Sequence, residues 1–250
     1  MADHCLNVLH FAFPGLPQVG CAVQTAGMDG TANMSWSHGD AAQVRACRKN
    51  LLAALPGVER LAELKQVHGD AIVMEPEAQD WLSGPHPLPE ADGLACSLQH
   101  SGPGLGLVIK TADCQPILLA HRGGRHIAAI HAGWRGNRCN FPGTAVVRLC
   151  EHYKLKPRDW LAVRGPSLGP TCAEFVNFDR EWGAEFAPWF EPQSRCMDLW
   201  QLTRHQLQEA GIPAAQIYGM DICTRTNPLF HSYRRDRNCG RQAAIIWLKG

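Results

Sequence analysis

Residues 104–136 read GLGLVIKTADCQPILLAHRGGRHIAAIHAGWRG, and this stretch decides how the rest of the chain is interpreted. Within it, three short apolar runs follow one another at Gly106–Lys110, Pro116–Ala120 and Ile127–His131. Apolar runs of about four to eight residues bounded by turn-forming residues are typical of buried β-strands. Because the connections between them are short, we predict that the three strands are antiparallel neighbours.

Outside this stretch, strand-like and helix-like segments intermix along the chain. Further strands are predicted at Leu64–Val67, Ala71–Met74, Leu161–Arg164, Ile217–Met220 and Ala243–Leu248. Helical spacing of apolar residues predicts helices at Ala41–Leu55, at about Thr144–Tyr153 and at about Met197–Ala210. Neither a G-x-G-x-x-G motif nor a P-loop is present. The order of the segments therefore favours an α/β (α+β) fold, a single domain over residues 1–250 with mixed β-sheets layered with helices rather than a doubly wound parallel sheet.

Composition narrows the possible partners. The 250 residues are 45% apolar and 19% charged, with a net charge of +1, so a substantial core can form and no basic stripe or acidic tail is visible. We therefore expect a small-molecule substrate, no nucleic acid and no membrane, while the oligomeric state stays open. The N-terminus has no signal-peptide pattern, and we expect a cytoplasmic protein. The eleven cysteines form no C-x-x-C pair, and most are expected to be buried free thiols rather than disulfides.

Three polar segments follow or interrupt the apolar runs. They are Lys65–Asp70 (KQVHGD), Thr111–Pro116 (TADCQP) and His131–Gly136 (HAGWRG). Two imidazoles and one thiolate, from His68, Cys114 and His131, are good zinc ligands, and a site with three protein ligands keeps the open position that catalysis requires. Taken one by one, each residue could equally be structural, and the spacing matches no short metal motif. Cys139 is the nearest candidate for a fourth ligand that would close the site.

Together, these motifs resemble the laccase-domain family. This family is also called the multicopper polyphenol oxidase or purine nucleoside phosphorylase-like family, and its bacterial members are also known as peptidoglycan editing factors. The resemblance covers nearly the whole chain through QVHGD at Gln66–Asp70, ADGL at Ala91–Leu94, KTADCQPILL at Lys110–Leu119, HAGWRG at His131–Gly136, GPSLGPTCAEF at Gly165–Phe175 and SYRRDRNCGRQAAIIWL at Ser232–Leu248. It implies a single α/β domain in which His68, Cys114 and His131 bind zinc.

The resemblance also implies an activity on purine nucleosides. The reactions are phosphorolysis of adenosine, inosine, guanosine and methylthioadenosine, and deamination of adenosine, with the nucleoside and phosphate as small-molecule partners. Zinc would lower the pKa of a water for attack on adenine. Candidate phosphate-binding cations are Arg48, Arg135 and Arg164, although a surface salt bridge is an equal interpretation of Arg164. His38 is expected to line the pocket, and Asp113 is a candidate general acid or a turn cap.

Two other enzyme classes use the same residues. A copper-dependent polyphenol oxidase would suit one of the family's names, and a His-Cys-His site can bind copper. However, multicopper chemistry needs clustered imidazoles, and no His-x-His pair occurs among the twelve histidines. A metal-free hydrolase that edits peptidoglycan precursors would use Cys114 as nucleophile and His68 or His131 as base. A local departure from the family pattern, Asn137–Pro142 (NRCNFP), lies directly after HAGWRG and predicts a late start for the next helix.

Overall fold

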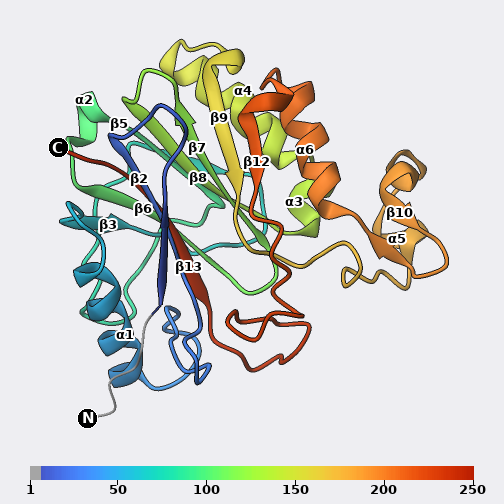
Figure 1. Ribbon diagram of the computed structural model, residues 1–250, viewed down its shortest axis with the longest axis horizontal. Helices are drawn as coiled ribbons and strands as arrows, with labels where there is room; N and C mark the ends of the chain where they lie inside the picture. The colour runs from blue at the N-terminus through green and yellow to red at the C-terminus, as the bar shows by residue number, and fades with distance from the viewer. Residues whose placement is uncertain (1–6) are drawn as a thin grey trace.

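The computed structural model describes residues 7–250, and two mixed β-sheets form its centre (Figure 1). Residues 1–6 lie outside the described residues. They include Cys5 and the start of the N-terminal segment for which no signal peptide is predicted. The first sheet has the strand order β1-β2-β13-β6-β3. Its strands are β1 (Val8–Phe11), β2 (Val19–Gln24), β13 (Gln242–Leu248), β6 (Leu105–Thr111) and β3 (Arg60–Ala62).

The second sheet has six strands in the order β12-β9-β7-β8-β5-β4. Its outer pairs, β12 with β9 and β4 with β5, are parallel, and the pairs between them are antiparallel. The strands are β12 (Ile217–Gly219), β9 (Trp160–Arg164), β7 (Gln115–His121), β8 (His126–Ala132), β5 (Gly93–Ser97) and β4 (Ile72–Met74).

Side-chain alternation arranges the two sheets and the helices in four layers. Alternate residues such as Leu107 of β6 and Leu118 of β7 meet in the core between the sheets. On the outer face of the first sheet, Val108 packs under α1 (Ala41–Ala53). On the outer face of the second sheet, Ile117 packs under α4 (Phe141–Tyr153) and α6 (Leu199–Glu209). These layers confirm the predicted fold class of mixed sheets with helices.

The remaining elements are short. Between β5 and β9 lie α2 (Leu98–Ser101), α3 (Trp134–Arg138) and a 3-10 turn at Pro157–Asp159. A projection to the right in Figure 1 carries α5 (Phe178–Glu181), a 3-10 turn at Ala184–Trp189 and the two-stranded sheet of β10 (Phe190–Glu191) and β11 (Cys196–Met197). A last 3-10 turn, Ala214–Gln216, precedes β12.

The prediction that three consecutive central strands are antiparallel neighbours is wrong for the first of them. β7 pairs with β8 and β9, whereas β6 pairs with β13 and β3 in the other sheet. The chain crosses between the sheets at residues 112–114, where Asp113 has a left-handed backbone (φ 88°). Because β13 and β3 are distant in sequence, nothing local distinguishes this crossing from a hairpin. The crossing carries the TADC motif.

The strand predicted at Leu64–Val67 is also wrong. Residues 63–67 are not a strand, because their only β-type pairing is an isolated bridge between Lys65 and Glu90. The preceding strand, β3, ends at Ala62. The Gln66 side chain takes the place of a strand here, because its amide accepts from Lys110 N at 2.9 Å and donates to Lys110 O at 2.8 Å. The sequence-based prediction also missed six strands, which are β1, β2, β3, β5, β10 and β11. Helix α4 begins at Phe141, directly after the left-handed Asn140 that separates it from α3, and so begins earlier than predicted.

Two expectations from composition can be compared with the described residues. The ten cysteines among residues 7–250 are all free thiols, and five of them are buried. Within the same residues, the helices are too short and too polar to cross a lipid bilayer.

Candidate metal centre

Three candidate ligands meet at one end of the six-stranded sheet. Cys114 ends the crossing that leads into β7, and His131 lies near the end of β8, opposite Pro116 of β7. His68 lies in the turn before β4, with a left-handed backbone (φ 61°). One ligand atom from each residue lies within 4.8 Å of the other two, and Cys114 Sγ is 3.8 Å from His68 Nε2.

Asp92, just before β5, holds two of these ligands in place. Its Oδ1 accepts from His131 Nδ1 at 2.7 Å and from the backbone N–H of His68 at 3.0 Å. Its Oδ2 accepts from Gly69 N at 2.7 Å and Val67 N at 3.3 Å. With Nδ1 engaged, the Nε2 atom of His131 is free to bind a metal, and a carboxylate behind a histidine is the usual partner of a metal-binding imidazole.

The three side chains favour a deprotonated thiol. Burial alone would raise the pKa of Cys114, but the imidazoles of His131 and His68 outweigh it and lower that pKa to about 6. Burial alone would lower the pKa of His131, but the Cys114 thiolate and the hydrogen-bonded Asp92 carboxylate raise it to about 9. The pKa of Asp92 is itself lowered, since its hydrogen bonds outweigh its burial. A thiolate is the form of cysteine that binds metals.

The donor set fits a single metal ion. Zinc bonds of about 2.0–2.3 Å place tetrahedral ligand atoms roughly 3.3–3.8 Å apart. The 3.8 Å between Cys114 Sγ and His68 Nε2 falls in this range, and all three ligand atoms lie within 4.8 Å of one another. Among residues 7–250 this is the one group of three or more His, Cys, Asp or Glu side chains with metal-binding spacing. Cys139 does not belong to it, because its thiol is exposed and donates to Gly136 O. The described residues therefore provide three candidate ligands and no candidate for a fourth.

Gly133 leaves room for two of the ligands. A Cβ at this position would lie 3.0 Å from Cys114 Sγ and 3.1 Å from His68 Cδ2. Contacts this short would press on both candidate ligands, so the glycine of HAGWRG suits the close approach of the backbone.

A cavity of about 870 Å³ opens in front of the three ligands. His38, Asp113 and Arg135 from the predicted site also line it. The Arg135 guanidinium lies 4.3 Å from the ring centre of Trp134, which also lines the cavity. Arg135 is exposed and its side chain forms no hydrogen bond with residues 7–250, so its guanidinium is available to a ligand. A cavity of this size suits a small organic molecule.

Asp113 lines the cavity, but both of its carboxylate oxygens are engaged. Oδ1 accepts from Thr224 Oγ1 at 2.7 Å, and Oδ2 accepts from Arg234 N at 2.7 Å. These bonds join the sheet crossing to the loop between β12 and β13. They favour the turn-cap interpretation of Asp113 over that of a general acid.

Arg48 and Arg164 do not line the cavity. Arg48 is fully buried, with its guanidinium 3.8 Å from the ring centre of Trp81. Its donors reach Glu63, Met34 O and Trp81 O. Arg164 is nearly as buried, forms an ion pair with Asp221 and stacks on Trp200. We therefore leave both out of the proposed substrate site.

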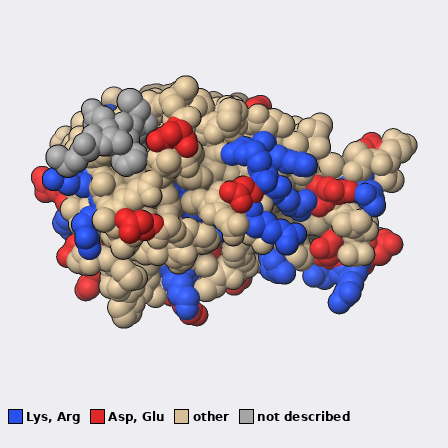
Figure 2. Space-filling model, turned by 90° about the horizontal axis from the view of Figure 1, so that it is seen from below, with Lys and Arg blue, Asp and Glu red and all other residues tan. Residues whose placement is uncertain are grey.

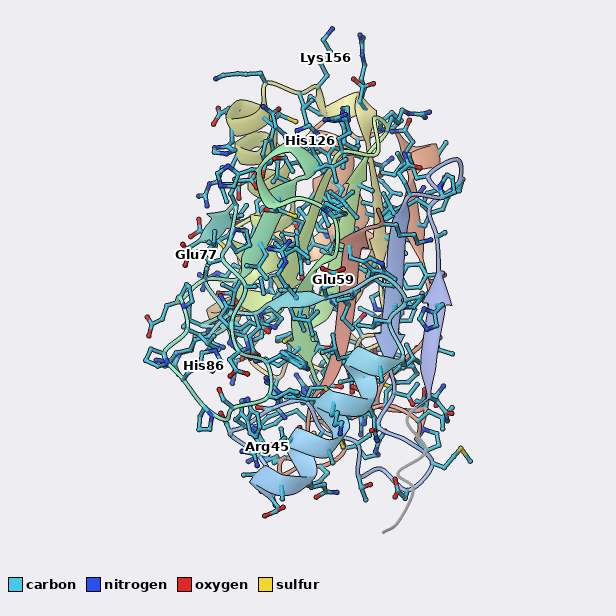
Figure 3. The ribbon with its side chains drawn as sticks, turned by 90° about the vertical axis from the view of Figure 1, so that its left-hand side faces the viewer. Arg45, Glu59, Glu77, His86, His126 and Lys156 are labelled. Atoms are coloured by element: carbon cyan, nitrogen blue, oxygen red, sulfur yellow. The ribbon has the colours of Figure 1, made fainter. Side chains whose placement is uncertain are left out.

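Sequence reasoning missed three residues at this site. Asp92 is part of the ADGL motif, and a carboxylate close to a predicted metal-binding histidine was a usable signal. Lys110 directly precedes TADC and lines the cavity. His86, which had no partner at ligand spacing, lines it from the Pro-rich loop at residues 83–89, seen at the left of Figure 3. No local pattern indicates that this loop turns inward.

Comparisons with known proteins agree with this geometry. A family model described as multi-copper polyphenol oxidoreductase laccase matches residues 21–249. The purine nucleoside phosphorylase YfiH of Shigella flexneri is 35% identical over 210 residues, which cover 80% of this chain and 79% of that protein. A purine nucleoside phosphorylase of Xylella fastidiosa is 35% identical over 194 residues, covering 74% and 71% of the two chains.

Solved structures show the same fold. A crystal structure of a Neisseria meningitidis protein superposes with a TM-score of 0.79 at 27% identity, covering 98% of this chain and all of that one. YlmD from Geobacillus stearothermophilus also gives a TM-score of 0.79 at 27% identity, covering 95% and 94% of the two chains.

Proposed function

The chain belongs to the multi-copper polyphenol oxidoreductase laccase family, as its motifs predicted, and from this premise we propose that it is a metal-dependent purine nucleoside phosphorylase. The observation that carries the proposal is the His68–Cys114–His131 group at the wall of a cavity large enough for a nucleoside. The relatives named purine nucleoside phosphorylases support this substrate class. The proposed substrates are adenosine, inosine, guanosine and methylthioadenosine, in a cytoplasmic protein.

The side chains around the cavity have separate roles in this proposal. Zinc, when bound by the three ligands, would supply a Lewis acid at the cavity wall. Asp92 orients His131 and the turn of His68 through its four hydrogen bonds. Trp134 offers an aromatic surface to the purine, and the exposed Arg135 offers a cation to an anionic group.

Adenosine deamination is proposed as a second reaction of the same site. It differs from phosphorolysis in a measurable way, because it releases ammonia and needs no phosphate. Product analysis with and without phosphate separates the two reactions: phosphorolysis yields adenine and ribose 1-phosphate, and deamination yields inosine.

A hydrolase with Cys114 as nucleophile is the second candidate. The 3.8 Å approach of His68 Nε2 to Cys114 Sγ favours it, because an imidazole beside a thiol can act as its base. Turnover by metal-free protein distinguishes this candidate from the metalloenzyme. A multicopper oxidase is less well supported, because residues 7–250 contain one three-ligand group rather than a cluster of several.

The proposal is tested by phosphate-dependent conversion of adenosine. Wild type should release adenine and ribose 1-phosphate only when phosphate is present. Cys114→Ala should lose at least about a hundredfold in kcat/KM, the scale seen when a group that contacts the reacting atoms is removed. Cys139→Ala is the matched control, because it removes an exposed thiol outside the ligand group. Equal losses in both variants, or turnover independent of phosphate, would refute the proposal.

A further inference from the structure

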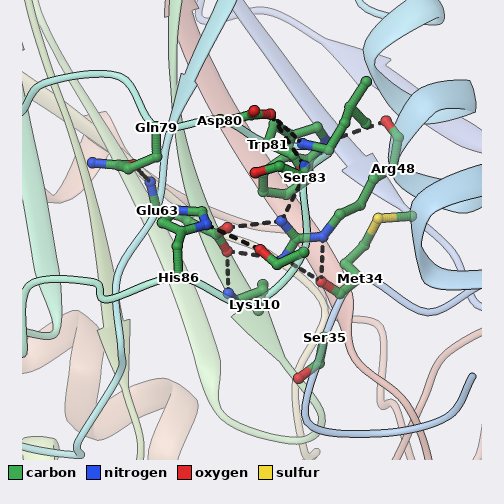
Figure 4. Close-up of polar contacts among 12 residues, drawn as sticks. Met34, Ser35, Arg48, Glu63, Gln79, Asp80, Trp81, Ser83, His86 and Lys110 are labelled. Atoms are coloured by element: carbon green, nitrogen blue, oxygen red, sulfur yellow. Dashed lines mark hydrogen bonds and ion pairs between the residues drawn. The ribbon is translucent and has the colours of Figure 1, made fainter. Parts of the chain in front are cut away.

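A buried ion cluster beside the cavity carries more positive than negative charge. Arg48 pairs with Glu63 at 2.7 Å, and Lys110 forms an ion pair with the same carboxylate (Figure 4). The side chains of Arg48 and Glu63 are 0% and 1% exposed. Two cations thus share one anion in a place where water screens little. A surplus buried charge is costly unless an opposite charge joins it or the group loses its proton, and burial does lower the pKa of Lys110.

The two cations differ in what they can still bind. All three nitrogens of the Arg48 guanidinium donate to protein acceptors, which are the two Glu63 oxygens, Met34 O and Trp81 O. The Lys110 ammonium has three donors, and Glu63 is its one hydrogen-bond partner among residues 7–250. Lys110 also lines the cavity, with 14% of its side chain exposed. The spare donors of the cluster are therefore those of Lys110.

We propose that Lys110 is the anchor of a phosphate subsite in this cavity, with Arg48 and Glu63 fixing its position from behind. The inference deepens the phosphorylase proposal and rests on it for the identity of the anion. A dianionic phosphate would compensate the surplus charge of the cluster and would accept the spare Lys110 donors.

The charge of the cavity wall is consistent with an anionic ligand. Five Lys or Arg side chains line the cavity against two carboxylates. Both carboxylates are engaged already, Glu90 with Lys65 at 2.7 Å and Asp113 as described above. In the right half of the face seen in Figure 2, Lys and Arg side chains gather with several Asp and Glu side chains among them. The loop between β12 and β13 at the bottom of Figure 1 carries exposed arginines at 225, 234, 235 and 237. Such a field attracts anions toward the cavity.

The backbone links this subsite to the candidate metal centre. Lys110 lies at the end of β6, four residues before Cys114. The Gln66 amide holds the Lys110 backbone on both sides, and Gln66 is two residues before His68. Lys110 and Cys114 therefore lie on one segment, and His68 lies on the neighbouring segment that Gln66 joins to it.

The reaction needs a phosphate held in this cavity. An oxygen of hydrogen phosphate forms a bond to C1′ of the ribose, and the C1′–N9 bond breaks with its electron pair on the purine. The proton of the hydrogen phosphate passes to the purine, which leaves as the free base, and ribose 1-phosphate retains the two negative charges. Lys110 holds the attacking phosphate and gains or loses no proton in this step.

Direct binding of inorganic phosphate to the purified full chain tests the proposal without relying on turnover. Isothermal titration calorimetry should show one phosphate site in wild type. Lys110→Met removes the ammonium group, keeps an unbranched side chain that is one atom shorter and leaves a neutral Arg48–Glu63 pair, so the variant should fold. It should bind phosphate roughly 10- to 100-fold more weakly, the usual range for a lost charge-assisted hydrogen bond. Lys110→Arg should restore much of the binding. Lys49→Met, on the exposed side of α1, is the matched control and should bind as wild type does.

Turnover then separates failure of the subsite from failure of the proposed function. If the inference holds, Lys110→Met raises the KM for phosphate by the same factor and changes the nucleoside KM much less. Phosphate binding that is unchanged in Lys110→Met overturns the subsite even if phosphorolysis is confirmed. Phosphate binding that is lost in Lys110→Met, in a protein without phosphorolysis, supports the anion subsite and refutes only the proposed reaction.

Discussion

Replacing Asp92 with asparagine should loosen two metal ligands at once. Each carboxylate oxygen of Asp92 accepts two N–H donors, whereas an asparagine offers one acceptor oxygen and turns an NH₂ group toward the other two donors. The less costly orientation of the asparagine keeps the hydrogen bonds from His68 N and His131 Nδ1. It loses the hydrogen bonds from Gly69 N at 2.7 Å and from Val67 N at 3.3 Å. Hydrogen bonds to a charged group contribute about 1.5–3 kcal/mol, and the Val67 contact is long, so we expect a loss of about 3 kcal/mol.

Urea denaturation of the metal-free protein measures this loss, and thermal unfolding should show a decrease in Tm of about 6–12 °C for a chain of this size. Metal affinity should also fall about 10- to 100-fold, because His131 loses the carboxylate behind it. Asp70→Asn is the matched control, since Asp70 forms an exposed ion pair with Arg148 at 2.8 Å and such pairs contribute at most about 1 kcal/mol. An Asp92→Asn protein as stable and as rich in metal as Asp70→Asn would refute the reasoning.

Three further predictions concern the surroundings of the site. Glu63→Gln should lower the free energy of unfolding by about 3–5 kcal/mol, because Arg48 and Lys110 lose their shared anion. The pKa of Glu63 is lowered in the folded state because its two cations outweigh its burial, so its contribution is present above the usual glutamate pKa of about 4.3 and is lost as pH falls below it. In urea titrations across pH, Glu63→Gln should therefore show a shallower loss of stability in acid, and an unchanged slope would contradict this. Gly133→Ala should lower metal occupancy in the purified protein, since its Cβ would press on Cys114 and His68; full occupancy would show that the loop can move. Arg135→Ala should raise a substrate KM about tenfold without changing Tm, because the residue is exposed; an unchanged KM would remove it from the site.

The three candidate metal ligands could be picked out because each lies in a short, recognisable motif. QVHGD, TADC and HAGWRG retain their order along the chain, and the structure brings their His68, Cys114 and His131 together. Most strands could also be predicted, because buried apolar runs such as those of β7 and β8 are visible without tertiary information. Their pairing could not be predicted, since β6 pairs with β13 and β3, which are distant from it in sequence, and the chain crosses to the other sheet before β7.

The residues around the ligands were harder to predict because their roles depend on contacts distant in sequence. Arg48 looked like a free cation, and its burial follows from Trp81 and Glu63, which lie 33 and 15 residues away. Lys110 was read as the end of an apolar strand, and its spare donors appear only once the other bonds of the cluster are known. A sequence shows which side chains can bind an anion, but only the fold shows which of them are already occupied.

The central claim is that His68, Cys114 and His131 hold one metal ion on which turnover depends. Elemental analysis of the purified chain, combined with adenosine phosphorolysis before and after chelation, tests it most directly. We expect about one zinc per chain, a loss of activity together with the metal, and recovery when zinc is returned. A metal-free chain that retains full activity would contradict the account and would favour Cys114 as a nucleophile, whereas several copper ions per chain would support the oxidase.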